Sequence, residues 1–97
     1  MLVTHNNKKV VQPNKEKLQN RLKRIEGQVR GIQRMIEEDR YCVDILFQVA
    51  AVKSAMNAVA IALMEDHTRH CVSRAVQTNG AEEAIAELME VVKRLTK

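Results

Sequence analysis

Apolar side chains repeat every three or four residues along two long stretches of this chain, and both stretches have the spacing of one helix face. The first stretch lies within residues 14–39 and consists of Leu18, Leu22, Ile25, Val29, Ile32 and Ile36. The second lies within residues 41–71 and consists of Ile45, Val49, Val52, Met56, Val59 and Leu63. The pattern therefore predicts two long α-helices, each with one apolar stripe.

Local signals at two places indicate where helices begin. Pro13 and Asn14 form a stop followed by an N-cap, directly before the first apolar stripe. Asn79 and Gly80 indicate a turn, and residues 81–97 after it have acids first and cations last, as a helix favours. We expect a shorter third helix there, with a buried face formed by Ile85, Leu88, Met89, Val92 and Leu95.

The predicted fold is all-α, a three-helix protomer with two long helices and one short helix. Residues 69–78 become gradually polar, so we expect the second helix to end or bend there. Residues 1–13 are predicted to be a mobile basic tail, and residues 14–97 a single helical domain. A chain of 97 residues with one Phe, one Tyr and no Trp buries little core alone. We therefore expect an obligate oligomer.

Positive charge is concentrated in the N-terminal third of the chain. Residues 1–34 hold nine lysines and arginines against two acids, a net of +7, whereas the other 63 residues have seven against ten, a net of −3. This asymmetry is typical of proteins that bind a polyanion. The candidate DNA-binding side chains line both flanks of the first helix and include one cation of the second: Lys17, Arg21, Arg24, Gln28, Arg30, Arg34 and Lys53.

Gly27 and Gly31 lie between these two flanks, opposite the apolar stripe of the first helix. Glycine inside a helix costs about 1 kcal/mol relative to alanine, so we expect a requirement for the missing side chains. Two interpretations remain open. The glycines permit close approach of a sugar-phosphate backbone, or they permit close packing against another helix of an assembly.

The two cysteines and one histidine extend the apolar seam of the second helix at its ends. His67 and Cys71 are i, i+4 neighbours, whereas Cys42 precedes His67 by 25 residues, roughly 38 Å along a continuous helix. One chain therefore cannot bring the three together. Two antiparallel copies crossing near Ala55 and Met56 could do so, and a two-fold axis would create two identical sites.

Two thiolates and one imidazole are a soft donor set. Three such donors favour Cu(I), with Zn(II) as the second choice because a structural zinc site usually has four ligands. The alternative is that these residues are buried small hydrophobes and a satisfied polar group. No stretch reads as a signal peptide or a membrane span, so we expect a cytoplasmic protein with reduced thiols and no membrane partner.

Three motifs in order resemble the copper-sensitive operon repressors, the CsoR family of bacterial metal-responsive regulators. The first is Asn-Arg-Leu-x-Arg-Ile-x-Gly-Gln-x-x-Gly-Ile at 20–32, the second is Tyr-Cys-x-Asp-Ile at 41–45, and the third is His-x-x-x-Cys at 67–71. The resemblance covers about residues 14–95. It implies an all-α, disc-shaped tetramer, a dimer of antiparallel dimers, that lacks a helix-turn-helix.

The resemblance also implies a mechanism. Metal-free repressors of this kind bind a GC-rich pseudo-palindromic operator, and Cu(I) held by Cys42 of one protomer and by His67 and Cys71 of the other releases the DNA, which derepresses copper efflux genes. Tyr41 and Glu87 match positions that could hydrogen-bond the far ring nitrogen of His67. For Glu87, an ordinary solvated helix acid is the alternative.

The ligand set discriminates among sister sensors of the same family. Nickel and cobalt sensors typically have histidine where this chain has Cys71, formaldehyde-responsive members lack the last cysteine, and persulfide-responsive members lack the middle histidine. His5 lies well upstream of the first helix and does not match the additional nickel ligand. Ala58 stands where some copper members have an arginine, so that part of the DNA surface differs.

The leading hypothesis is thus a Cu(I)-responsive transcriptional repressor and not an enzyme, since no oxyanion-hole loop or substrate pocket is visible in three helices. A sensor of zinc, nickel, cobalt or a thiol-reactive molecule would share the fold. A cytosolic copper buffer or chaperone would share the metal site, and sequence-specific DNA binding would separate it from a repressor.

Overall fold

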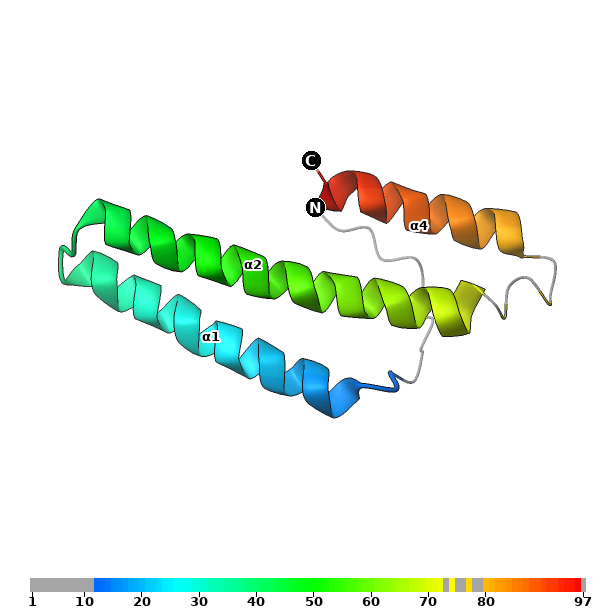
Figure 1. Cartoon of the computed structure of the whole chain (residues 1–97), viewed down its shortest axis with the longest axis horizontal. Helices are drawn as coiled ribbons and strands as arrows, with labels where there is room; N and C mark the ends of the chain where they lie inside the picture. The colour runs from blue at the N-terminus through cyan, green and yellow to red at the C-terminus, as the bar shows by residue number, and fades with distance from the viewer. Residues whose placement is uncertain (1–11, 73, 75–76, 78–79, 97) are drawn as a thin grey trace. The chain divides into compact units, whose positions relative to one another are not determined.

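The computed structural model describes residues 12–72, 74, 77 and 80–96, and every element within them is helical. The elements are α1 (Lys15–Glu37), α2 (Cys42–Asp66), the π-helix η1 (His67–Val72) and α4 (Ala81–Leu95) (Figure 1). The predicted all-α protomer with two long helices and one short helix is confirmed. The predicted tail, with His5, lies outside the described residues up to position 11, as does Asn79 of the predicted turn. The chain divides into two compact units with the boundary between Met56 and Asn57.

Helix α1 begins where the sequence predicts. Asn14 occupies the N-cap position, and its carbonyl oxygen accepts a hydrogen bond from the Leu18 N–H at 2.9 Å. Of the apolar stripe that follows, Leu18 and Ile25 are buried, whereas Leu22, Val29 and Ile36 remain more than one third exposed. A single protomer therefore covers only part of the stripe that the sequence pattern assigns to the core.

A Schellman turn ends α1. The N–H of Arg40 donates to the carbonyl of Met35 (2.9 Å) and the N–H of Asp39 donates to that of Ile36 (3.1 Å), which is the paired pattern of this motif. Asp39 takes the left-handed conformation that glycine usually supplies, with φ 55°. The turn reverses the chain within four residues, so α1 and the beginning of α2 run antiparallel (Figure 1).

Helix α2 is apolar on nearly every side, a pattern that belongs to buried helices. Yet Val59 is its only buried residue, and Leu46 and Phe47 are 63% and 69% exposed. By length and composition the segment Cys42–Arg69 could also cross a membrane, a test that core helices of soluble proteins pass as well. Across the described residues the buried core consists of Leu18, Ile25 and Val59 alone, so the expectation of a small core is confirmed.

The second unit contains the end of α2, the π-helix and α4. Gly80 is the N-cap of α4 and its carbonyl accepts the Ala84 N–H at 3.1 Å, so the predicted helix begins at the expected place. Helix α4 contacts η1. The predicted buried face of α4 is only partly covered, because Ile85, Met89 and Leu95 are exposed in the single chain.

Candidate metal centre and nucleic-acid interface

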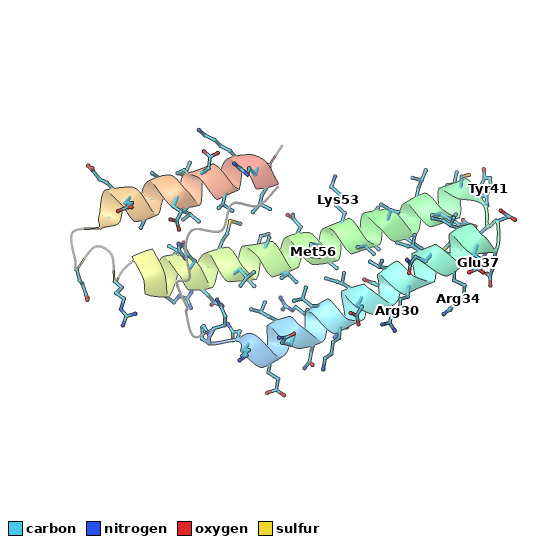
Figure 2. All side chains as sticks on the ribbon, turned by 180° about the vertical axis from the view of Figure 1, so that it is seen from behind. Arg30, Arg34, Glu37, Tyr41, Lys53 and Met56 are labelled. Atoms are coloured by element: carbon cyan, nitrogen blue, oxygen red, sulfur yellow. The ribbon has the colours of Figure 1, made fainter. Side chains whose placement is uncertain are left out.

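Cys42 is the first residue of α2. The Tyr41 carbonyl accepts hydrogen bonds from the N–H groups of Asp44 (3.0 Å) and Ile45 (3.2 Å), which fixes the start of the helix directly after the Schellman turn. The Cys42 thiol is free and exposed, and the neighbouring Tyr41 ring is 69% exposed. The first predicted donor is therefore accessible at the tip of the helical hairpin, where Figure 2 shows Tyr41.

The other two predicted donors lie in the π-helix, which begins at His67 itself. In a π-helix the hydrogen bonds run from i to i+5, so residues four apart lie almost above one another. His67 is half-buried. The backbone of Cys71 belongs to the same segment, while its side chain lies outside the described residues. The sequence predicted a bend here from the loss of apolar pattern, but it predicted neither the helix type nor the onset at His67.

Cys42 and His67 stand on either side of α2, because Cys42 is its first residue and His67 directly follows its last residue, Asp66. Their separation of 25 residues corresponds to roughly 38 Å along a continuous helix. Within the described part of the chain, no group of three or more His, Cys, Asp or Glu side chains is placed to hold a metal ion. The assignment of Cys42, His67 and Cys71 as ligands of one metal ion remains a prediction.

A line of accessible side chains connects the two ends of α2. Cys42, Val49, Met56 and Leu63 recur every seven residues, the spacing of a helix–helix seam. All four are exposed, and the three apolar ones are 44%, 47% and 38% accessible. Part of the seam that the sequence predicts is therefore uncovered in the single protomer, whereas Val59 of the same seam is buried and Ile45 and Val52 are half-buried. Cys42 stands at the start of this exposed line, and the π-helical donors follow just beyond its end.

Tyr41 and Glu87 lie on different elements. Tyr41 precedes Cys42 at the start of α2, and Glu87 is a half-buried residue of α4. Because α4 contacts η1, the helix that carries Glu87 packs on the segment that carries His67 and Cys71. The proposed hydrogen bonds from these two side chains to His67 remain a prediction.

The predicted DNA-binding cations are all exposed, but they do not form one patch on the protomer. Figure 2 shows Arg30 and Arg34 projecting from α1 on the side away from α2, whereas Lys53 projects from α2 on the side away from α1. Arg30 also forms an exposed ion pair with Glu26 at 3.8 Å, which is worth little in stability. A surface containing both Lys53 and the α1 cations needs more than one protomer.

Gln28, Gly27 and Gly31 stand out among the polar positions of α1. Gln28 is half-buried, and its Oε1 atom is buried without a hydrogen-bond partner among the described residues. Outside the neighbouring backbone of α1, a Cβ atom added at Gly27 or at Gly31 would meet no described atom within 4 Å. Packing among the described residues therefore does not explain either glycine.

The arrangement agrees with the comparisons to known proteins. Residues 14–94 match the family described as metal-sensitive transcriptional repressors, and the chain belongs to this family. It is 59% identical over 83 residues to the copper-sensing transcriptional repressor CsoR of Bacillus subtilis, covering 86% of this chain and 82% of that protein. It is 49% identical over 85 residues to the copper-sensing transcriptional repressor RicR of Mycobacterium tuberculosis, covering 86% of this chain and 88% of that one.

Two solved structures are similar in fold. The copper-sensing repressor CsoR with Cu(I) from Geobacillus thermodenitrificans has a TM-score of 0.85 and 43% identity, with 98% of this chain and 100% of that chain covered. The nickel-responsive regulator InrS has a TM-score of 0.70 and 40% identity, with 94% and 99% covered. Since a copper and a nickel sensor share the fold, the donor residues must decide which metal is bound.

Proposed function

We propose that this chain is a Cu(I)-responsive transcriptional repressor of the cytoplasm, without catalytic activity. The metal-free protein binds a GC-rich pseudo-palindromic operator, and Cu(I) releases it to derepress copper efflux genes. Its membership of the metal-sensitive repressor family supports this function, as does its sequence identity of 59% and 49% to two copper-sensing repressors. The single observation that carries the proposal is the line of exposed residues on α2, with Cys42 at the first position of the helix and His67 and Cys71 in the π-helix directly after its last residue.

The donor set fits Cu(I). Two thiols and one imidazole, from Cys42, Cys71 and His67, are soft ligands, and three of them satisfy an ion that accepts trigonal coordination. Zinc would usually need a fourth ligand. When bound, Cu(I) would link the start of α2 in one chain to the π-helical segment in another.

Association along the α2 seam would complete the site. Two antiparallel copies crossing near Met56 would cover Val49 and Leu63, which the single chain leaves exposed. The same pairing would place Cys42 of one copy beside His67 and Cys71 of the other, twice per dimer by symmetry. The dimer still exposes Phe47 and its neighbours, which supports further assembly into a dimer of dimers.

The protein's own residues would couple the ligands to the rest of the fold. Helix α4 contacts η1, so a change of position in the π-helical segment would act on α4 directly. Tyr41 and Glu87 would hydrogen-bond the His67 imidazole, fix its ring orientation and so favour one arrangement of the helices. The DNA-binding surface would contain Lys17, Arg21, Arg24, Gln28, Arg30, Arg34 and Lys53, gathered from several protomers.

The test is fluorescence anisotropy of a GC-rich palindromic duplex titrated with metal-free protein, repeated anaerobically with Cu(I). We expect tight binding that weakens steeply with salt and is abolished by about one Cu(I) per chain. Cys42→Ala should keep the DNA affinity and lose the copper response, because it removes a metal ligand and none of the cations of the proposed DNA-binding surface.

Each other outcome has a distinct meaning. Specific DNA binding that ignores Cu(I) would contradict the copper claim and leave a repressor that responds to zinc, nickel, cobalt or a thiol-reactive molecule. Cu(I) binding without any specific DNA binding would contradict the repressor claim and favour a copper buffer or chaperone.

A further inference from the structure

The outward side of α1, opposite its apolar stripe, carries cations at both ends and bare backbone between them. Lys23 and Arg24 lie one turn before Gly27, and Arg34 lies one turn after Gly31. We call these five residues the outer face of α1. Arg24 and Arg34 are ten residues apart, about 15 Å along the helix.

The cations of the outer face are available to a ligand. All three side chains are exposed, and among the described residues none of the three takes part in an ion pair. Arg30, on the edge of the face, is instead held by Glu26 at 3.8 Å. Figure 2 shows Arg34 directed away from α2, so α2 does not cover this end of the face.

The described residues give the two glycines no packing function. Outside the neighbouring backbone of α1, a methyl group at either position would meet no described atom within 4 Å, and alanine is a far better helix former than glycine. Glycine is the residue that lets a backbone approach a ligand closely. The need for glycine therefore arises from something outside the chain.

The positive charge of the outer face indicates what kind of partner it binds. A second copy placed on this face by two-fold symmetry would set lysines and arginines against lysines and arginines, and the copies have an uncharged seam on α2 available for pairing. A nucleic-acid backbone supplies the opposite charge, and phosphate contacts from cationic side chains fix the position of a protein on a duplex.

We propose that α1 lies with Gly27 and Gly31 directly against the sugar-phosphate backbone of the operator, with Lys23 and Arg24 on one side and Arg34 on the other holding phosphates. The inference rests on the proposed function and goes beyond it, because it assigns the two glycines as positioning residues for DNA. The glycines contribute by lacking side chains, which leaves room for the DNA backbone, and they add no charge to the contact.

The experiment measures operator affinity by anisotropy as a function of salt for Gly27→Ala and Gly31→Ala. Each should weaken binding by about tenfold or more at fixed salt. The slope of log affinity against log salt should stay close to that of the wild type, because no charge is removed. Arg34→Ala should instead reduce the slope by about 0.9 for each chain that contacts DNA.

A matched control is available at the same height of the helix. Gln33 is exposed and lies about 160° around the helix from Gly31, so Gln33→Ala raises helix propensity without changing the outer face. It should bind DNA as the wild type does. Thermal unfolding should show that both glycine variants are at least as stable as the wild type, which excludes misfolding as the cause of weaker binding.

Three results would overturn the inference. Wild-type affinity in both glycine variants would show that the space is not used. A changed oligomeric state in sedimentation velocity would show that the face packs against another copy. Failure of the wild type itself to bind any GC-rich palindrome would overturn the proposed function and this inference together, whereas loss in the glycine variants alone leaves the repressor intact.

Discussion

At the scale of single residues, Asp39 is the position where backbone conformation and residue type disagree. Its φ of 55° lies in the left-handed region, yet it is not glycine. A left-handed conformation costs an L-residue roughly 1–2 kcal/mol, less for Asp and Asn, whose short polar side chains tolerate it. The Schellman hydrogen bonds of Asp39 and Arg40 hold Asp39 in the left-handed conformation. This turn also determines that α2 begins at Cys42.

Relieving this strain should stabilise the protein. We expect Asp39→Gly to raise the free energy of unfolding by about 0.5 kcal/mol, after the greater freedom of glycine in the unfolded chain is deducted. Urea denaturation at fixed protein concentration measures the change. Glu38→Gly is the matched control, because Glu38 has a φ of −85° and glycine there should destabilise. Equal effects at both positions would contradict the assignment of strain to Asp39.

The residue scale also separates what the sequence could predict from what it could not. Asn14 as the N-cap and Gly80 at the start of the last helix were predictable, because each residue type has a local chemical preference for its position. Asp39 was missed, since the sequence offers no glycine at the end of α1. The polar change after Arg69 indicated a bend, but hydrogen-bond register is not encoded by apolar spacing, so the π-helix was missed.

At the scale of elements, α2 is an apolar helix that the single chain leaves largely exposed. Met56 lies at the middle of the exposed seam and is 47% accessible. In an antiparallel pair the two copies of Met56 would face each other near the two-fold axis. The same helix therefore supplies the proposed dimer contact and Cys42 of the proposed metal site, and the π-helix with His67 and Cys71 follows directly after it.

A charge at the middle of the seam should separate the dimer. Met56→Glu would place two carboxylates together, a cost of several kcal/mol that weakens dimerisation on the order of a hundredfold or more. Sedimentation equilibrium measures the association, and the copper stoichiometry should fall with it. Met56→Leu should leave both unchanged. An unaltered dimer in the Glu variant would place the contact on another face of α2.

The sequence predicted these elements well but could not predict their burial. The apolar periods predicted α1 and α4 to within two residues at each end, because helix spacing is a local property. The end of α2 was expected within residues 69–78, whereas the helix ends at Asp66. The burial of an apolar stripe depends on what packs against it. The sequence pattern of the stripe is the same whether its own chain or another copy covers it. Ile85 and Met89 illustrate this, since their spacing predicts a core face and the single chain leaves them exposed.

At the scale of the whole molecule, the proposed site can be tested by mixing two inactive variants. Cys42→Ala and Cys71→Ala chains each lack a ligand in every site of their own dimers. A mixed dimer holds one intact site if the donors come from different chains, so random mixing should restore about a quarter of the wild-type sites. Cu(I) titration with a competing chelator gives the count.

The mixing experiment has a clear opposite result. If each chain completed its own site, no mixture of the two variants could bind Cu(I) as the wild type does. A His67→Ala and Cys71→Ala mixture is the control, because both ligands come from the same chain in either arrangement and mixing should restore nothing.

The length of α2 has a consequence for the amount of repressor that a cell must make. With the proposed ligands Cys42 and His67 on either side of α2, a lone chain would offer Cu(I) only fragments of a site. Mass action then links the metal affinity to protomer concentration, as it does for any ligand that binds only the assembled form. Dilution below the dimer dissociation constant would raise the copper level needed for a response, so the threshold of the sensor would depend on its own expression.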